Sequence, residues 1–471
     1  MKTINNIALF IMIIGALFLS ACGNIEGGSS TYSVTYFGTG GTPVPTDSNQ
    51  YTSGKTLTIN DGTLITRSGY NFAGWSTSPG GPLIGGTLSV SSENITLYAS
   101  WSEQVVATQV ITFTGTANTP GSNDGTGTGA QFNYPNGIAI DSYNNIYITD
   151  TSNHIIRRIT PDGVVSTFAG TTGVSGTDDG NGSAAEFNSP HGITVDSSNN
   201  IYIADYGNHT IRKITIDGDV TTIAGTAGTN GHSDNTGTDA LFRDPVGIVA
   251  DTNGNLFVTE FRGKVVRKLT PGAGGYEVTT IAGIYGTDGI GAEGIGTSVA
   301  LNRLYDITID ASGNLYLPQY ANGIIRKLED DNDDGIYNVT TISGIHASLG
   351  IDDGTHDGGD SVWQTGEARF RKPSGIVFDA SGNLYVTDEW ADTIRKLTPD
   401  SGNYIVTTYA GLGDNVHNNS SSDPKHWDAG SLVNGALLDA RFNGPKSMAF
   451  DSLGNLYVVD KYNHVIRKIG F

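Results

Sequence analysis

The chain has 471 residues, more than one ordinary domain needs, and combines 65 glycines with only 15% charged residues. This composition favours β-structure with many turns over helical bundles. The formal net charge of −21 would repel phosphate backbones, so nucleic acid is not an expected partner.

The first 30 residues have the features of a bacterial leader. A lysine precedes the apolar run IALFIMIIGALFL, which is short for a membrane span, and LSAC follows at residues 19–22. This stretch resembles the lipobox of bacterial lipoproteins, which implies a signal peptide over 1–21, lipidation of Cys22 and a spacer over 22–30. The implied location is the cell envelope, at the outer membrane or the cell surface. A plain secretory leader with a chance cysteine is the alternative. Because Cys22 is the only cysteine, the chain can form no intrachain disulfide and no Cys-based zinc site.

Residues 31–103 contain short β-type runs separated by Gly, Pro and Asn turns. They resemble the Listeria-Bacteroides repeat, also called the internalin B-repeat type, through VTY at 34–36, GYNFAGW at 69–75 and TLYASW at 96–101. The resemblance implies a small β-grasp-like module that acts as a spacer or an adhesive unit. We expect a spacer.

Residues 110–471 form a repeat array. Three apolar phrases recur six times in a fixed order, as in GIAID at 137, NIYITD at 145 and IIRRI at 155. A fourth phrase, such as VVSTFAG at 164, follows five of the six third phrases, and the missing copy is VITFTG at 110–115. The pattern predicts an all-β fold, a six-bladed β-propeller closed by strand 110–115 and preceded by the small β-grasp-like domain.

Within this array, Asn153-His154, Asn208-His209 and Asn463-His464 each precede an apolar residue. Together with the P-x-G-I and N-[IL]-Y-[IV]-x-D phrases, they resemble NHL repeats. The fourth unit departs most from the pattern, with Gln319 in place of an acidic residue. Arg157 and Asp150 occupy positions that recur in the other blades, so we expect these groups to hold the structure together rather than to react with one ligand.

The residue just before each first strand varies in chemistry, although six blades converge there on the channel mouth. These residues are Asn136, His191, Val246, Tyr305, Ser374 and Lys446. We expect a ligand-binding ring here, supported by Glu260 and Gln319, where the recurring aspartate is replaced. The alternative is that these positions are loop ends that tolerate change.

The long loops between blades should lie on the same face as this ring, where binding surfaces are usually built. The last two place Trp363 and Trp427 among carboxylates and amides, an arrangement that suits sugar rings or peptides. Alternatively, both rings fill small cores of their own loops.

The segment EDDNDDGIY at 329–337 resembles the start of a calcium loop, with Asp330, Asn332 and Asp334 followed by Gly335. Its twelfth position is Thr341, however, and not a bidentate glutamate. A solvated acidic turn is the main interpretation and a structural calcium ion the alternative. No other cofactor is expected.

These features favour a lipid-anchored envelope protein whose propeller binds a protein, peptide or glycan. The competing hypothesis is a propeller enzyme of the lyase or lactonase type, which the NHL resemblance implies, working around His191 and Glu260. Only one histidine lies in the ring, and there is no Ser nucleophile elbow or H-E-x-x-H spacing, so catalysis is the minor reading. A purely architectural surface protein is a third possibility.

Overall fold

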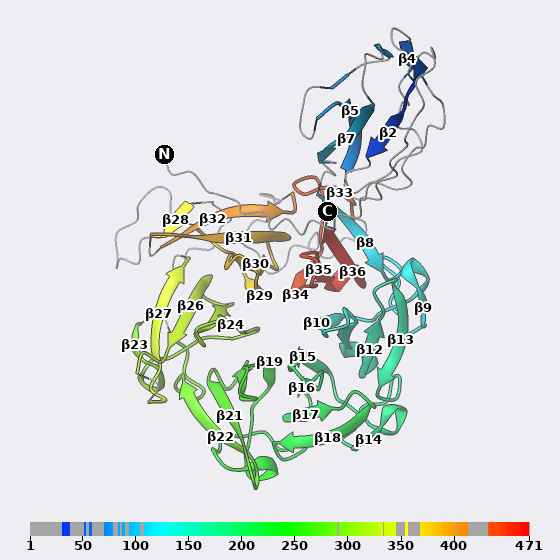
Figure 1. Cartoon of the computed structure of the whole chain (residues 1–471). Coiled ribbons are helices and arrows are strands. Elements are labelled where there is room, and N and C mark those ends of the chain that lie inside the picture. Colours follow the sequence, from blue (N-terminus) through cyan, green and yellow to red (C-terminus); the bar gives the residue numbers. More distant parts are fainter. Residues whose placement is uncertain are drawn as a thin grey trace. The chain divides into compact units, whose positions relative to one another are not determined.

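The computed structural model divides the chain into two compact units, Met1–Val106 and Ala107–Phe471. It describes residues 31–37, 51–52, 56–58, 70–78, 83–84, 87–89, 94–103, 108–289, 292–332, 334–344, 354–356, 368–401, 403–412 and 432–470. The secondary structure of these residues consists of strands and short 3-10 turns (Figure 1). None of the helices found in these ranges is long and apolar enough to cross a membrane.

The first unit contains a mixed three-stranded sheet. Strand β7 (Ile95–Glu103) pairs in parallel with β2 (Val34–Phe37) and antiparallel with β5 (Tyr70–Ser76). Trp75 and Tyr36 are buried in it and meet edge to face, with ring centroids 4.9 Å apart. Two short antiparallel pairs accompany the sheet: β1 (Thr31–Tyr32) with β3 (Tyr51–Thr52), and β4 (Thr56–Thr58) with β6 (Thr87–Ser89).

The second unit is a six-bladed β-propeller, with the innermost strand of each blade toward the centre of the ring (Figure 1). Each blade is an antiparallel sheet. From inner to outer strand, blade one has β10 (Pro135–Ile140), β11 (Ile146–Asp150), β12 (Ile155–Ile159), β13 (Val164–Ala169) and β9 (Gly125–Thr126). Blade two has β15 (Pro190–Val195), β16 (Ile201–Asp205), β17 (Thr210–Ile214), β18 (Asp219–Ala224) and β14 (Gly180–Asn181). Blade three has β19 (Pro245–Ala250), β20 (Leu256–Glu260), β21 (Val266–Gly272) and β22 (Gly275–Ala282).

The remaining blades follow the same plan. Blade four has β24 (Thr308–Ile309), β25 (Leu315–Gln319), β26 (Ile324–Glu329), β27 (Asn338–Ser343) and β23 (Gly294–Ile295). Blade five has β29 (Pro373–Phe378), β30 (Leu384–Asp388), β31 (Thr393–Asp400), β32 (Asn403–Ala410) and β28 (Gly354–His356). Blade six has β34 (Pro445–Phe450), β35 (Leu456–Asp460), β36 (Val465–Gly470), β8 (Gln109–Thr114) and β33 (Gly435–Ala436).

Short 3-10 turns lie in the loops. They are η1 (Gly127–Gly129), η2 (Thr151–Asn153), η3 (Gly182–Ala184), η4 (Gly237–Asp239), η5 (Gly296–Ser298) and η7 (Lys461–Asn463).

Blade six joins the two ends of the propeller chain. Strand β8, from its N-terminal end, pairs antiparallel with β36, from its C-terminal end, in a register that sets Val110 opposite Ile469. This pairing adds the fourth strand to the sheet of blade six, so the blade that closes the ring is complete.

The hydrophobic cores lie between neighbouring blades. One cluster joins Tyr147 and Ile156 of blade one to Ile203 of blade two, and another joins Ile138 of blade one to Tyr457 of blade six. Equivalent clusters fill the other four interfaces. Side chains alternate between the two faces of a blade, and each face packs against one neighbouring blade. Each blade therefore depends on both neighbours to bury its apolar side chains.

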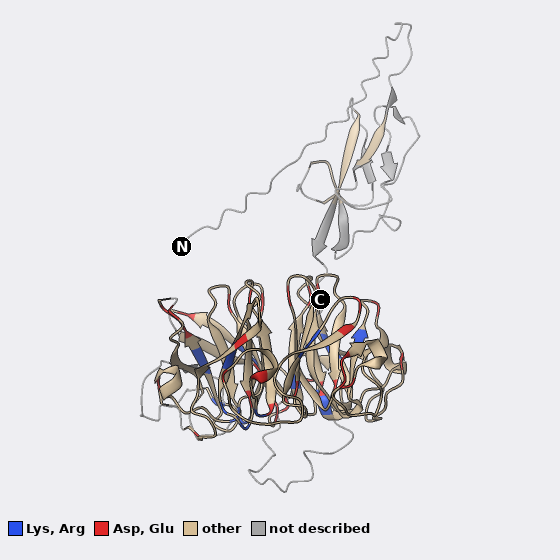
Figure 2. Ribbon diagram, turned by 90° about the horizontal axis from the view of Figure 1, so that it is seen from below, with Lys and Arg blue, Asp and Glu red and all other residues tan. Residues whose placement is uncertain are grey.

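The two faces of the propeller disc differ in their connections. Each inner strand begins, and each second strand ends, on the face that carries the loops from one blade to the next, such as residues 170–189. We call this the long-loop face. Figure 2 shows the disc from the side, with the strands running between its two faces.

Candidate functional site

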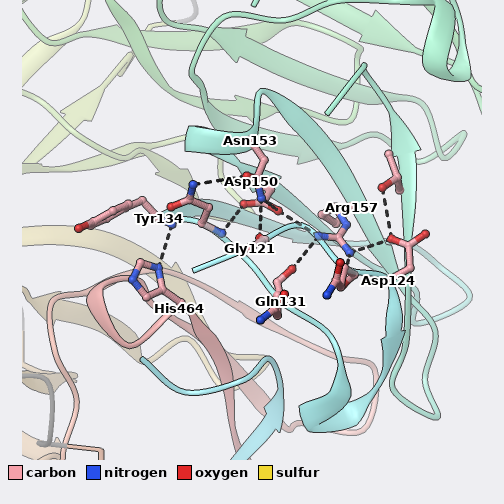
Figure 3. Close-up of polar contacts among 11 residues, drawn as sticks. Gly121, Asp124, Gln131, Tyr134, Asp150, Asn153, Arg157 and His464 are labelled. Atoms are coloured by element: carbon pink, nitrogen blue, oxygen red, sulfur yellow. Dashed lines mark hydrogen bonds and ion pairs between the residues drawn. The ribbon is translucent and has the colours of Figure 1, made fainter. Parts of the chain in front are cut away.

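The cluster of Asp150, Asn153 and Arg157 is a structural network inside blade one (Figure 3). Arg157 Nη1 donates to Asp150 Oδ2 at 3.0 Å and to the carbonyl of Gln131 at 2.8 Å, while Nη2 donates to Asp124 Oδ1 at 2.8 Å. The guanidinium therefore ties the end of the second strand to the preceding long loop. The same contacts recur around Arg212, Arg267 and Arg467, with Asp205, Glu260 and Asp460 as their buried partners.

The histidines of the NHL motif link neighbouring blades. The backbone N–H of Ser189 in blade two donates to His154 Nδ1 at 2.9 Å, and that of Tyr134 in blade one donates to His464 Nδ1 at 3.1 Å (Figure 3). Burial lowers the pKa of His154 and of His464, which keeps Nδ1 available as an acceptor. These imidazoles belong to the scaffold and not to the channel mouth.

A single pocket gathers the six variable residues at the start of the inner strands. In five blades this residue is the second of its strand and not the residue before it, whereas Tyr305 precedes β24. It opens at the channel mouth, and its empty volume, which includes open solvent, is about 340 Å³. Its lining includes these six, which we call the mouth residues: Asn136, His191, Val246, Tyr305, Ser374 and Lys446. One variable side chain from every blade thus faces a shared space on the long-loop face.

The glycine after most mouth residues makes this convergence possible. A Cβ on Gly192 would lie 2.1 Å from the carbonyl oxygen of Val246, and one on Gly375 would lie 2.0 Å from that of Lys446. Side chains cannot fit there, so the inner strands approach closely only with glycine. Blade four departs from this rule with Asp306, which also lines the pocket.

Asp306 reaches across to two other blades. Its Oδ2 accepts a hydrogen bond from Ser447 Oγ of blade six at 3.2 Å and from the Ile376 N–H of blade five at 3.4 Å. Its Oδ1 accepts from the N–H of Ile307 at 2.9 Å. Burial raises the pKa of this carboxyl to about 6. Sequence reasoning missed Asp306, although an aspartate at a position where four other blades have glycine after Pro-x was the available signal.

Two mouth residues have polar atoms without partners among the described residues. The side chain of Asn136 is 8% exposed, and its Nδ2 makes no hydrogen bond. His191 stacks on Tyr206 with ring centroids 4.4 Å apart, and its Nδ1 is shielded from solvent without a hydrogen-bond partner. Burial, assisted by the positive charges of Lys461 and Lys446, holds the pKa of His191 well below its usual range. The imidazole is therefore neutral at pH 7.

Lys446 is the most buried cation of the mouth. Its Nζ donates to Glu389 Oε2 at 2.6 Å and lies 3.8 Å from the ring centroid of Tyr305. Tyr462 donates to the other oxygen of Glu389 at 3.4 Å. Although burial lowers it, the pKa of Lys446 is raised overall by Glu389. The ammonium is thus charged and paired.

Glu260 and Gln319 do not lie at the mouth, which corrects the interpretation of their position. Both side chains are fully buried inside their blades. Glu260 accepts from Arg267 at 2.7 Å and from the N–H of Arg243 at 2.9 Å, whereas Gln319 accepts from Asn322 Nδ2 at 2.9 Å. Side chains alternate along a strand, so the residue after each of these turns to the mouth instead. His191 and Glu260 consequently do not form the pair on which the enzyme hypothesis depended.

The acidic hairpin forms a turn stabilised by its own carboxylates. Asp330 accepts the N–H of Asp334 at 3.1 Å through Oδ1 and the N–H of Gly335 at 2.9 Å through Oδ2, and Asn332 is exposed. In the part of the chain that the structure describes, no group of three or more His, Cys, Asp or Glu residues has a geometry suited to a metal ion. Cys22, Trp363 and Trp427 lie outside the described residues.

Fold and blade chemistry together define a β-propeller with a small pocket at its channel mouth. Comparison with family models identifies NHL repeats at residues 132–159 and 187–214 and a Listeria-Bacteroides repeat domain at residues 32–100. The chain therefore carries NHL repeats and a Listeria-Bacteroides repeat domain, as their motifs predicted.

The curated relatives include a protein named for its NHL repeats. NHL repeat-containing protein 2 of Bos taurus is 29% identical over 378 residues, which cover 74% of this chain and 40% of that protein. Protein SUPPRESSOR OF QUENCHING 1, chloroplastic, of Arabidopsis thaliana is 26% identical over 347 residues, covering 71% of this chain and 30% of that protein. The chain spans less than half the length of these two relatives.

Solved structures confirm the fold. A protein of unknown function from Bacteroides thetaiotaomicron aligns with a TM-score of 0.55 and 18% identity, covering 88% of this chain and 89% of that one. A protein from Bacteroides ovatus described as an auxiliary nutrient binding protein aligns with a TM-score of 0.56 and 19% identity, covering 80% of each chain.

Proposed function

We propose that this chain is a lipid-anchored bacterial cell-envelope protein whose propeller binds a protein, peptide or glycan at the channel mouth and the surrounding long loops. The observation that carries the proposal is the pocket shared by the six mouth residues, in which Asn136 Nδ2 and His191 Nδ1 are buried without a hydrogen-bond partner among the described residues. Buried polar groups are nearly always satisfied, so these two nitrogen atoms are available to hydrogen-bond a ligand or water in this concave site.

The mouth is also suited to recognition by its variability. Repeated positions hold the scaffold in every blade, whereas the mouth residues differ in all six. A rigid frame with a varied rim is a common way to build a binding site. Related folds include Bacteroides proteins described as auxiliary nutrient binding proteins, and a binding role suits this chain equally.

Glycan and peptide arrays probed with the full chain test the binding role. We expect a ligand whose affinity falls at least about tenfold, which corresponds to roughly 1.4 kcal/mol, in Asn136→Ala and in His191→Ala. Trp363→Ala and Trp427→Ala should weaken the same ligand if the long loops contribute. The matched control is Tyr143→Ala, a 65% exposed side chain in the turn between β10 and β11 on the opposite face. Loss of binding in this control alone would contradict the proposed site.

The membrane anchor rests on the LSAC stretch that ends at Cys22. Acyl chains on this residue would hold the protein at a membrane without a spanning helix. Cells grown with an alkyne-tagged palmitate should label the wild-type chain and place it in the membrane fraction, and Cys22→Ser should abolish both. Labelling that persists in Cys22→Ser would overturn the anchor and leave the binding role untouched.

A further inference from the structure

Three side chains at one corner of the mouth carry hydrogen-bonding atoms that no described residue engages. They are Asn136 with Nδ2, His191 with Nδ1 and Tyr206 with its phenol hydroxyl. Asn136 and His191 line the pocket, and Tyr206 stacks on His191 with ring centroids 4.4 Å apart and an angle of 11° between the rings. Tyr206 is partly exposed, so its hydroxyl can reach a molecule held in the mouth.

One threonine brings this corner together. Thr149 Oγ1 accepts the N–H of Gly137, the residue after Asn136, at 2.7 Å and donates to the carbonyl of His191 at 2.5 Å. Glycine at position 137 makes this approach possible, because a Cβ there would lie 2.3 Å from the same carbonyl oxygen. The inner strands of blades one and two are therefore held side by side, and the corner is formed before any ligand arrives. Binding to a preformed site costs little ordering of side chains.

Blades three and four supply an aromatic wall to the same pocket. Tyr305 lines the pocket, and the ring of Phe261 lies 5.0 Å from it at an angle of 53°. Both rings are partly exposed, and we call these two residues the aromatic wall. Tyr320 is 9% exposed and supports Tyr305 with its ring 4.6 Å away. Sequence reasoning missed Phe261 and Tyr206, which occupy one variable position directly after the second strand of their blades.

The charged groups that line the pocket are engaged within the protein. Lys446 pairs with Glu389 at 2.6 Å, and Asp306 accepts three hydrogen bonds from its own and neighbouring blades. The site therefore offers a ligand neutral hydrogen-bonding atoms and aromatic carbon rather than an unpaired charge. A ligand that matches it carries C–H groups and neutral polar groups side by side.

We propose that the channel mouth is a saccharide site, in which Asn136, His191 and Tyr206 hydrogen-bond the hydroxyls of one neutral pyranose and the aromatic wall contacts its C–H face. A pyranose carries hydroxyls around its edge and C–H groups on its faces, which matches the corner and the wall. This inference rests on the proposed binding function and selects carbohydrate from the ligand classes named there.

Hydroxyls suit the corner better than the groups of a peptide backbone. A hydroxyl both donates and accepts, whereas a peptide N–H only donates and a peptide carbonyl only accepts. The amide nitrogen of Asn136 is a donor, the hydroxyl of Tyr206 serves both ways, and Nδ1 of the neutral His191 donates or accepts according to its tautomer. Neighbouring hydroxyls of one sugar can satisfy all three atoms with either tautomer.

Two arrays probed with the full chain distinguish these ligand classes. One carries neutral oligosaccharides of glucose, galactose, mannose, xylose and N-acetylglucosamine, and the other carries random-sequence peptides. We expect binding to saccharides and its loss in Asn136→Ala. Binding to peptides alone, if Asn136→Ala loses it, would leave the proposed binding function standing and overturn the saccharide site. Binding to neither array would also overturn the saccharide site.

Variants of Tyr206 test its place in the site. Calorimetry with the saccharide that binds best on the array should show an affinity at least about tenfold lower for Tyr206→Ala, because both the ring and its hydroxyl are lost. Tyr206→Phe keeps the ring, so its affinity should lie between those of the wild type and Tyr206→Ala. Equal affinities of the wild type and Tyr206→Ala would contradict the site.

Tyr285→Ala is the matched control for folding. Tyr285 stacks on His232 with ring centroids 4.4 Å apart and an angle of 14°, nearly the geometry of Tyr206 on His191. Its other ring contact among the described residues is Arg243, and neither of these neighbours lines the pocket. Both alanine variants should lower the melting temperature by a similar amount, whereas only Tyr206→Ala should weaken saccharide binding. Equal losses of affinity in the two variants would mean that stability causes the effect, and would overturn the role of Tyr206.

Discussion

At the scale of single residues, we expect the buried Asp–Arg pairs to contribute more to the free energy of unfolding than the exposed pairs. Arg157 pairs with Asp150, whose side chain is 0% exposed, and with Asp124, whose side chain is 53% exposed. Burial raises the pKa of Asp150 to about 6, so this carboxylate is ionised at pH 8. The same guanidinium thus offers a buried and an exposed partner for comparison.

We predict that Asp150→Asn lowers the free energy of unfolding at pH 8 by about 3–5 kcal/mol, because it leaves a buried arginine without its charge partner. The matched change Asp124→Asn should cost about 0–1 kcal/mol. Asp150 Oδ1 also accepts the N–H of Asn133 at 2.7 Å, a bond that the amide serves less well. Chemical denaturation measures both variants, and equal losses would show that burial does not set the strength of the pair.

Blade four shows how a blade tolerates a neutral residue at this position. Gln319 replaces the carboxylate, and Arg326 donates to Thr341 Oγ1 at 2.5 Å. Burial lowers the pKa of Arg326 to about 10. Arg326 thus has a hydrogen bond to a threonine hydroxyl in place of a carboxylate. Arg157 of blade one would lack this replacement in an Asp150→Asn variant.

The histidine links predict a loss of stability in acid. The pKa values of His154 and His464 are lower in the folded chain than the usual 6.5, so their contribution is complete above pH 6.5 and declines as pH falls toward the folded values. In blade five the same position is Asp392, whose Oδ1 accepts the Gly444 N–H at 2.8 Å. The melting temperature of the variant His154→Asp/His464→Asp should therefore fall less between pH 7 and pH 5 than that of the wild type. Parallel curves for the two proteins would contradict this assignment.

At the scale of elements, strand β8 shows why the array could be recognised from sequence. Its side chains alternate, with Val110 fully buried in the cluster between blades five and six and Ile111 43% exposed. Period-two patterning of this kind identifies strands, and repetition of the phrases identifies blades. Residues that depart from the repeat at a conserved position of the pattern, such as Glu260, were harder to place. A changed residue at a repeated position suggested function there, but strand alternation points it into the blade.

The same alternation gives a prediction for β8. Val110→Asp buries a carboxylate among Phe442, Ile469 and their neighbours, and should lower the free energy of unfolding by at least about 3 kcal/mol. Ile111→Asp places the same charge on the exposed side and should change it by less than about 1 kcal/mol. Thermal melts compare the two variants. A severe loss in Ile111→Asp would indicate that this side of β8 is covered in solution.

The limits of sequence reasoning at the mouth have a physical cause. The mouth residues could be predicted because they lie at the start of a recognisable strand, and the structure brings all six into one pocket. The partner of Lys446 could not, because Glu389 lies in the loop after β30 of blade five, 57 residues away in the sequence, and meets Lys446 only when blades five and six pack together. The repeated phrases identify only the contacts that all blades share, whereas a side-chain pair such as Lys446 and Glu389 occurs between one pair of blades.

At the scale of the whole molecule, stability is shared around a closed ring. Every blade interface holds a hydrophobic cluster, and the one between blades six and one is completed by residues near both ends of the array, including Phe113 and Ile466. Removing one contribution to the ring exposes two blade edges at once. Each unit also has buried residues of its own, such as Trp75 in the first and Phe132 in the second.

This arrangement predicts that the second unit folds alone, but only with β8. A chain of residues 107–471 retains all six interface clusters and should melt within about 2 °C of the full chain, a shift that corresponds to under about 1 kcal/mol. A chain of residues 116–471 lacks β8 and leaves β36 with an unpaired edge beside an opened core, so it should lose its cooperative transition or melt far lower. Calorimetry of the two chains compares them directly. A chain of residues 116–471 as stable as 107–471 would mean that the other five blades hold the ring without closure, whereas a destabilised 107–471 would mean that the first unit contributes to the stability of the propeller.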